Sequence, residues 1–139
     1  MKPFTLEVVT QEKHLLTETV TNLTLTTEVG ELTILADHLP LFVRLMPGEL
    51  RYTSHGEQHF FAVTGGFVDV SPRNITTVLA DSAIRSDQIN LQEAEEAISN
   101  AQKALAEAPD DKTTLKIEME LRTAMIKANI ARKHQAGLN

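Results

Sequence analysis

Residues 86–111 read SDQINLQEAEEAISNAQKALAEAPDD, and at this stretch the chain changes its composition. Before residue 87 lie all six aromatic residues, all nine valines and 13 of the 16 threonines, whereas ten of the 14 alanines follow residue 86. Valine, threonine and aromatic side chains favour strands, and alanine is the best helix former. We therefore expect a β module over residues 1–85 and an α module over residues 86–139.

Apolar residues in two segments of the α module recur at the spacing of one helical face. They are Ala94, Ala97, Ile98, Ala101, Ala104 and Leu105 in residues 87–107, and Ile117, Leu121, Ala124, Met125, Ala128 and Ala131 in residues 112–135. Pro109 ends the first segment, and the aspartates after it can cap the second. Ser86 or Asp87 is our candidate cap for the first. The short link predicts an antiparallel αα-hairpin.

The facing stripes of this hairpin consist mainly of alanine and hold no aromatic residue. Because hydrophobic stabilisation scales with buried area, we expect the hairpin to be weakly held on its own. The first helix carries a net charge of −4 and the second +4. These charges are either ordinary solvated ion pairs, or they leave a basic second helix ready to meet an acidic partner once the helices separate.

In the β module, apolar and polar residues alternate at Phe4, Leu6 and Val8 and again at Leu23 and Leu25, which is typical of strands buried on one face. Further strand segments are residues 31–36, 42–45, 49–54, 57–63, 66–71 and 74–80, separated by glycine- or proline-containing turns. Many short strands at this spacing predict an antiparallel β-sandwich of about ten strands.

The composition excludes several classes of protein. The 139 residues include no cysteine, which excludes a disulfide framework, a cysteine zinc site and a thiol nucleophile. No apolar run is long enough to span a bilayer, and the first residues lack a signal-peptide pattern. The net charge of −6 argues against general nucleic-acid binding.

No pattern of residues indicates catalysis. His55 and His59 flank an expected hairpin turn, and no carboxylate pattern completes a metal site around them. The glycines at residues 65–66 lack the Lys-Ser/Thr ending of a phosphate loop, and no serine lies in a nucleophile elbow. We therefore expect a binding or interaction protein without a cofactor or metal.

Four segments occur in the order and spacing of a known family. They are GELTILADHLPL at residues 30–41, LMPGEL at 45–50, AVTGGFVDV at 62–70 and ITTVLADSA at 75–83. Together with the helical hairpin, they make nearly the whole chain resemble the epsilon subunit of F-type ATP synthases. The resemblance implies a non-catalytic rotor subunit of the central stalk, whose sandwich joins the gamma subunit to the proteolipid ring. It also implies a peripheral subunit on the cytoplasmic face of the inner membrane, or on the stromal side of a thylakoid.

The resemblance implies two sets of contact residues. Glu31 and His38 are candidates for contact with the ring, although His38 has an alternative role in hydrogen bonding a turn. The hairpin would regulate the enzyme: it folds onto the sandwich, or it extends so that its basic second helix reaches an acidic segment of the catalytic subunits and inhibits hydrolysis. The candidates for that contact are Lys116, Arg122, Lys127, Arg132 and Lys133, which do not share one helical face.

One segment departs from the family. Some members bind ATP through Ile/Leu-Asp-x-x-Arg-Ala at the start of the first helix, where this chain has INLQEA at residues 89–94. Asn90 replaces the aspartate, and Glu93 replaces the arginine. A carboxylate in place of a guanidinium repels phosphate, so we expect weak or absent ATP binding. This disfavours a nucleotide sensor, and the remaining alternative is a stand-alone sandwich with a helical dimerisation tail.

Overall fold

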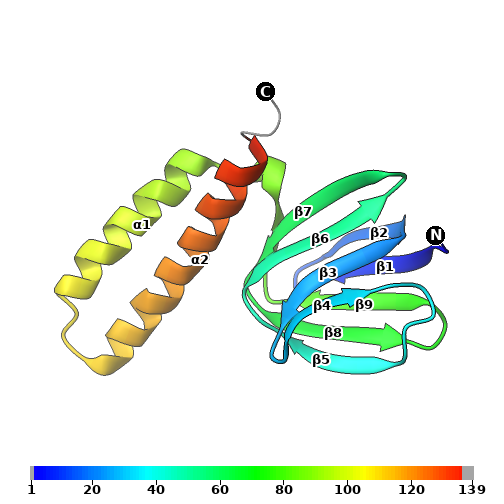
Figure 1. Cartoon of the computed structure of the whole chain (residues 1–139). Helices are drawn as coiled ribbons and strands as arrows, with labels where there is room; N and C mark the ends of the chain where they lie inside the picture. The colour runs from blue at the N-terminus through cyan, green and yellow to red at the C-terminus, as the bar shows by residue number, and fades with distance from the viewer. Residues whose placement is uncertain (1, 136–139) are drawn as a thin grey trace. The chain divides into compact units, whose positions relative to one another are not determined.

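The computed structural model describes residues 2–135 and divides the chain into two compact units, residues 1–85 and residues 86–139 (Figure 1). The first unit holds ten strands. They are β1 (Phe4–Val9), β2 (His14–Val20), β3 (Asn22–Thr27), β4 (Gly30–Ile34), β5 (Leu41–Leu45), β6 (Gly48–Ser54), β7 (Glu57–Val63), β8 (Gly66–Ser71), β9 (Ile75–Ala80) and β10 (Ala83–Arg85).

The strands form two layers. One layer runs β10-β7-β6-β3-β4 and the other β5-β8-β9-β1-β2, and the pair Thr27 and Leu45 joins them between β3 and β5 (Figure 1). The sandwich expected from the sequence is confirmed, with one difference: β1 and β9 pair in parallel. Residue spacing along one strand does not determine its partner, so this pairing depends on the tertiary fold.

Strand β2 is absent from the sequence-based expectation. Its residues HLLTETV alternate poorly, because it is the edge of its layer and several of its side chains are exposed. An edge strand has a neighbour on one side only, so its sequence is less constrained than that of a central strand.

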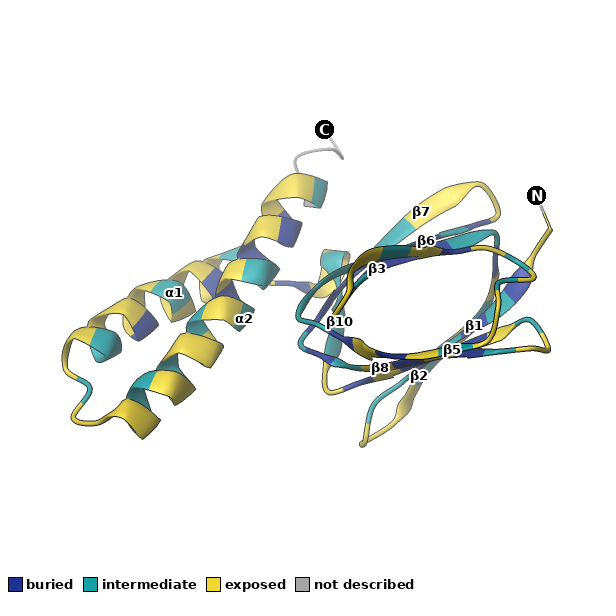
Figure 2. Cartoon of the chain, turned by 60° about the horizontal axis from the view of Figure 1, so that its bottom comes forward, coloured by how far each residue is buried: buried dark blue, intermediate teal, exposed yellow. Residues whose placement is uncertain are grey.

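The interior of the sandwich is packed with large side chains, and the buried positions line the inner surfaces of both layers (Figure 2). Fully buried residues include Leu6, Leu25, Leu50 and Tyr52. The ring of Tyr52 stacks on that of His59 with centroids 5.0 Å apart. This core packs the two layers of strands against each other.

The second unit contains a 3₁₀ turn, η1 (Ser86–Gln88), followed by α1 (Leu91–Ala106) and α2 (Asp111–Gln135). The expected cap of the first helix is wrong, because the cap is Asn90, whose side-chain oxygen accepts a hydrogen bond from the Glu93 N–H at 3.0 Å. Residues 86–88 form the 3₁₀ turn instead. The cap of α2 is confirmed: Asp110 Oδ1 accepts from the Thr113 N–H at 2.7 Å.

The interface between the two helices consists mainly of small residues. Ala94 and Ala101 are buried on α1, and Ala124, Ala128 and Ala131 are buried on α2. Met125 was expected on this stripe but is 47% exposed, because it lies to the side of the alanine row. Arg132 of α2 forms an ion pair with Glu95 of α1 at 3.4 Å. Neither described helix is long and apolar enough to cross a membrane.

Candidate interaction surfaces

An apolar patch covers the outer face of the β5-β8-β9 layer. Phe67 of β8 lies directly opposite Leu79 of β9, and the Phe67 ring stacks on that of Phe42 of β5 with centroids 5.3 Å apart. The three side chains are 44%, 43% and 63% exposed, respectively. We call these three residues the sandwich patch. Clusters of exposed large apolar residues are typical of surfaces that bind proteins, membranes or ligands.

Sequence reasoning missed the sandwich patch. The alternation of side chains along each strand could have revealed it, because successive residues of a strand point to opposite faces. Val43 and Val68, which follow Phe42 and Phe67, are buried, so both phenylalanines point outward. Composition placed all six aromatic residues in the β module but did not assign each of them to a face of its strand. Only Phe4, Tyr52 and Phe61 are buried there.

Glu31 lies near the start of β4, at the end of the sandwich where β8 begins and β9 ends. It pairs across the strands with Thr26, and its carboxylate lies 3.5 Å from the Arg51 guanidinium. Its side chain is 62% exposed. Glu31 is therefore available to a partner that approaches this end.

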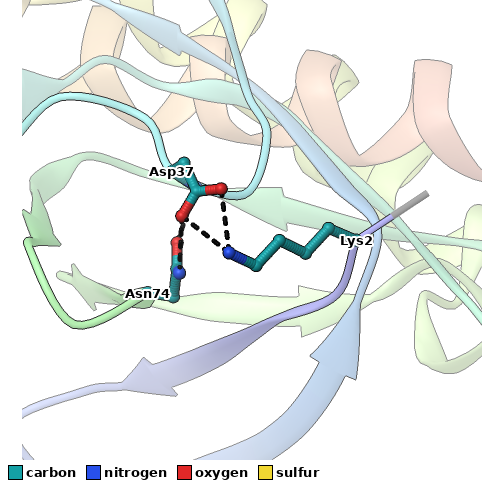
Figure 3. Close-up of polar contacts among 3 residues, drawn as sticks. All are labelled: Lys2, Asp37 and Asn74. Carbon is teal, nitrogen blue, oxygen red and sulfur yellow. Dashed lines mark hydrogen bonds and ion pairs between the residues drawn. The ribbon is translucent and has the colours of Figure 1, made fainter.

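His38 lies in the loop after β4. Beside it, Lys2, Asp37 and Asn74 form a polar cluster that joins three segments and that we call the polar lock (Figure 3). In the lock, Lys2 Nζ lies 2.9 Å from Asp37 Oδ2, and Asn74 Nδ2 donates to Asp37 Oδ1 at 3.0 Å. These two hydrogen bonds, led by that from Asn74, hold the pKa of Asp37 below its usual value. The His38 ring Nδ1 lies 2.7 Å from the Leu39 carbonyl, which is the turn hydrogen bond offered as its alternative role.

The structure places Glu31 and His38 at opposite ends of the sandwich. Asn74, which bonds Asp37 next to His38, lies in the turn from β8 to β9, whereas Glu31 lies at the far end of those two strands. A flat partner that covers one end of the sandwich therefore contacts one of the two residues.

The basic candidates on α2 differ in their surroundings. Lys116 and Arg122 are exposed, Lys127 is half-buried, and Arg132 is engaged by Glu95. Lys133 is exposed and lies three helical turns beyond Arg122, on the same face. Arg122 lines a shallow groove of about 420 Å³ together with Glu118, Leu121, Met125, Ile126 and Asn129.

The segment that aligns with the ATP motif forms the start of α1. Asn90 uses its side-chain oxygen to cap the helix, and Glu93 occupies the first turn, where an acidic side chain interacts favourably with the helix dipole. Both residues thus have a structural role in this chain.

A second cleft, of about 380 Å³, lies between β2 and the β6–β7 hairpin and is lined by Glu18, Glu57, His55 and His59 with nearby hydroxyls. Among the described residues, no group of three or more histidine or acidic side chains has the geometry to hold a metal ion. Tyr52 is buried nearby, and its hydroxyl has no hydrogen-bond partner among the described protein atoms. Burial, followed by the charge of Glu18, raises the pKa of Tyr52 to about 12.

A β-sandwich with an exposed apolar patch, joined to a helical hairpin whose buried residues are mainly alanines, is the arrangement of an assembly subunit. Residues 3–86 match the family model for the β-sandwich domain of the ATP synthase delta/epsilon chain. The chain is 35% identical over 130 residues to the ATP synthase epsilon chain of Herpetosiphon aurantiacus, with coverage of 94% of this chain and 95% of that one. It is 37% identical over 133 residues to the epsilon chain of Chloroflexus aggregans, with coverage of 96% and 95%.

Solved structures share the fold. A chain of the Euglena gracilis mitochondrial ATP synthase (OSCP/F1/c-ring) superposes with a TM-score of 0.80 at 24% identity, with coverage of 95% of this chain and 82% of that chain. A chain of the Tetrahymena thermophila central stalk and c-ring superposes with a TM-score of 0.65 at 15% identity, with coverage of 91% and 95%. The chain therefore belongs to the delta/epsilon family of ATP synthase, whose epsilon members are non-catalytic stalk subunits.

Proposed function

We propose that this chain is the rotor subunit that couples the proteolipid ring to the gamma shaft and that its hairpin restrains ATP hydrolysis. The observation that carries the coupling role is the sandwich patch: three apolar side chains project from a rigid sheet without a packing role inside the sandwich. Membership of the epsilon family supports another stalk subunit as the protein that covers the sandwich patch. The chain then acts as a peripheral subunit of the membrane complex.

We expect the gamma subunit to cover the sandwich patch. Phe67→Asp places an unpaired charge at its centre, so affinity for a gamma-type subunit should fall by at least about tenfold. Titration calorimetry with purified gamma subunit measures the loss. Leu115→Asp is the matched control, because Leu115 is a similarly exposed apolar residue at 60%, but on α2. Unchanged affinity in Phe67→Asp would contradict this assignment.

Glu31 is our candidate for contact with the ring, whereas His38 lies at the opposite end of the sandwich. Because the chain has no cysteine, Glu31→Cys and His38→Cys each introduce a unique crosslinking site. We expect crosslinks to the ring subunit from residue 31 and none from residue 38. Crosslinks from residue 38 alone would reverse the orientation of the sandwich.

The hairpin is proposed to inhibit through the basic residues of α2. Deletion of residues 87–139 should leave assembly intact and raise ATP hydrolysis by the complex. Arg122 is exposed, so reversal of its charge should relieve inhibition more than reversal of Lys127, which is half-buried, or of Arg132, which is paired with Glu95. Equal hydrolysis in the deletion variant and the full chain would refute an inhibitory role.

A further inference from the structure

Helix α2 has a second apolar face, on the side opposite to its alanine stripe. At about 100° per residue, Leu115, Met119 and Ile126 lie across the helix from Ala124, Ala128 and Ala131. Leu115 is 60% exposed and Met119 is 63% exposed, although both are large apolar residues. With the groove beside Arg122 and Ile126, they form what we call the outer face of α2: Leu115, Glu118, Met119, Arg122, Met125, Ile126 and Asn129.

The outer face carries two opposite charges that lack partners. Glu118 and Arg122 lie one helical turn apart, and within residues 2–135 neither side chain takes part in a hydrogen bond or ion pair. The large apolar residues flank them, Leu115 on one side and Ile126 on the other. The spacing of four, three and four residues along Leu115, Met119, Arg122 and Ile126 is that of a two-helix seam.

We propose that the outer face of α2 binds a second copy of itself, in an antiparallel pair whose two-fold axis passes between residues 120 and 121. In this pair Leu115 lies opposite Ile126 of the second copy, and Met119 packs on the aliphatic stem of the second copy's Arg122. The guanidinium then reaches Glu118 of the other helix. A two-fold axis repeats each contact, so the pairing of Leu115 with Ile126 and that of Met119 with Arg122 each occur twice in the dimer.

The charges select the direction of pairing. A parallel pair in register would place Arg122 against Arg122 and Glu118 against Glu118, and like charges repel. The antiparallel pair replaces both repulsions with two attractive pairs. Because the seam covers only about four helical turns, its buried area lies at the low end of specific interfaces, and we expect a weak dimer of the isolated subunit. This pairing is independent of the proposed rotor function, but it covers Arg122, so a dimer and a contact of Arg122 with the catalytic subunits exclude each other.

Sedimentation velocity of the full chain over a concentration series, up to about 1 mM, tests the proposal. We expect a monomer–dimer equilibrium. Met119→Asp should raise the dissociation constant at least about tenfold, because it buries a charge in the seam. Met119 is exposed in the monomer, so the variant should keep its helical circular dichroism.

Charge reversal identifies the partner face. Glu118→Arg and Arg122→Glu should each weaken the dimer by about fivefold or more, and the double variant should restore it, because the two pairs re-form with opposite polarity. Glu96→Arg, an exposed reversal on α1, is the matched control and should leave the dissociation constant unchanged. A chain that stays monomeric throughout the series, a dimer that survives Met119→Asp, or a double variant that is not rescued would each overturn the proposal.

Discussion

The two units of the chain bury different kinds of side chain. The sandwich interior contains leucines, valines and three aromatic residues, several of them with no exposed area, whereas alanine predominates among the buried residues of the helical unit. Since stabilisation follows apolar area, each buried leucine or aromatic residue of the sandwich contributes more than a buried alanine of the hairpin. We therefore expect the sandwich to be held more strongly than the interface between the two helices.

The polar contacts also differ between the two units. In the sandwich, Asp37 ties the loop after β4 to the turn between β8 and β9, and the Ser54 hydroxyl donates to the Thr19 carbonyl, which joins β6 to β2. Between α1 and α2, the ion pair of Arg132 and Glu95 is half-exposed, and such pairs contribute little. We therefore expect a change inside one unit to affect the stability of that unit more than that of the other.

The largest expected effect is a truncation in the sandwich core. Leu25→Ala removes a fully buried side chain and should lower the free energy of unfolding by about 2–5 kcal/mol. Tyr52 is the only tyrosine and the chain has no tryptophan, so its fluorescence during urea denaturation reports on the sandwich alone. Leu115→Ala, at an exposed position on α2, is the control and should leave this transition unchanged. Equal losses in both variants would remove the contrast between the units.

The second-largest loss of stability is expected at a glycine of the sandwich. Gly66 has φ of +134°, and a Cβ added there would collide with the Leu79 carbonyl oxygen. We therefore expect Gly66→Ala to cost about 1–3 kcal/mol in the same urea experiment. Gly56 is the matched control: its φ is +79°, but a Cβ would meet no atom within 4 Å. A cost at Gly56 as large as that at Gly66 would show that backbone strain alone, without the collision, explains the loss.

The buried hydroxyl of Tyr52 predicts alkaline sensitivity of the sandwich. Its pKa is raised to about 12 in the fold, so the unfolded chain loses this proton first as the pH rises. Stability from this group is complete below about pH 10 and is lost as the pH rises towards 12. Ultraviolet titration of this single tyrosine measures the pKa, and Tyr52→Phe should reduce the loss of stability. A normal pKa in the folded chain would contradict the burial.

The cap of α1 should have a smaller effect, confined to the helical unit. Asn90→Ala removes the side-chain oxygen that binds the Glu93 N–H and should cost about 1 kcal/mol. Loss of helical circular dichroism at lower urea, with the Tyr52 transition unchanged, would show that the two units unfold separately. Asn90→Asp should retain the cap. A joint shift of both signals would instead show that the units unfold as one.

The smallest effect concerns the polar lock around Asp37. Its lowered pKa means that its stabilising contribution is complete above the unfolded value, near 3.8, and is lost as the pH falls through the lower folded value. Asp37→Asn should flatten the acid side of the stability curve measured by Tyr52 fluorescence. Because Asp37 and Lys2 are exposed, the change is expected to be small. Glu57→Gln, an exposed carboxylate away from the lock, should leave the curve as it is.

Local patterns predicted most elements but few of their partners. The alternation at Phe4, Leu6 and Val8 indicates a strand, because side chains on a pleated strand alternate between two faces. The parallel pairing of that strand with β9 joins segments about 70 residues apart in sequence. The cap of α1 was missed because Ser86, Asp87 and Asn90 are all good caps, and the 3₁₀ turn at residues 86–88 decides among them.

The sequence by itself determined that aromatic and β-branched residues build a sandwich and that an alanine-rich remainder builds a hairpin, because strand and helix preferences and periodicities are local properties. Only the tertiary structure decided which exposed residues share a surface. It brought Phe42, Phe67 and Leu79 into one patch and separated Glu31 from His38 by the length of the sandwich. The physical reason is that strand pairing and the folding of one layer over another set these distances, and both depend on contacts between residues remote in the chain.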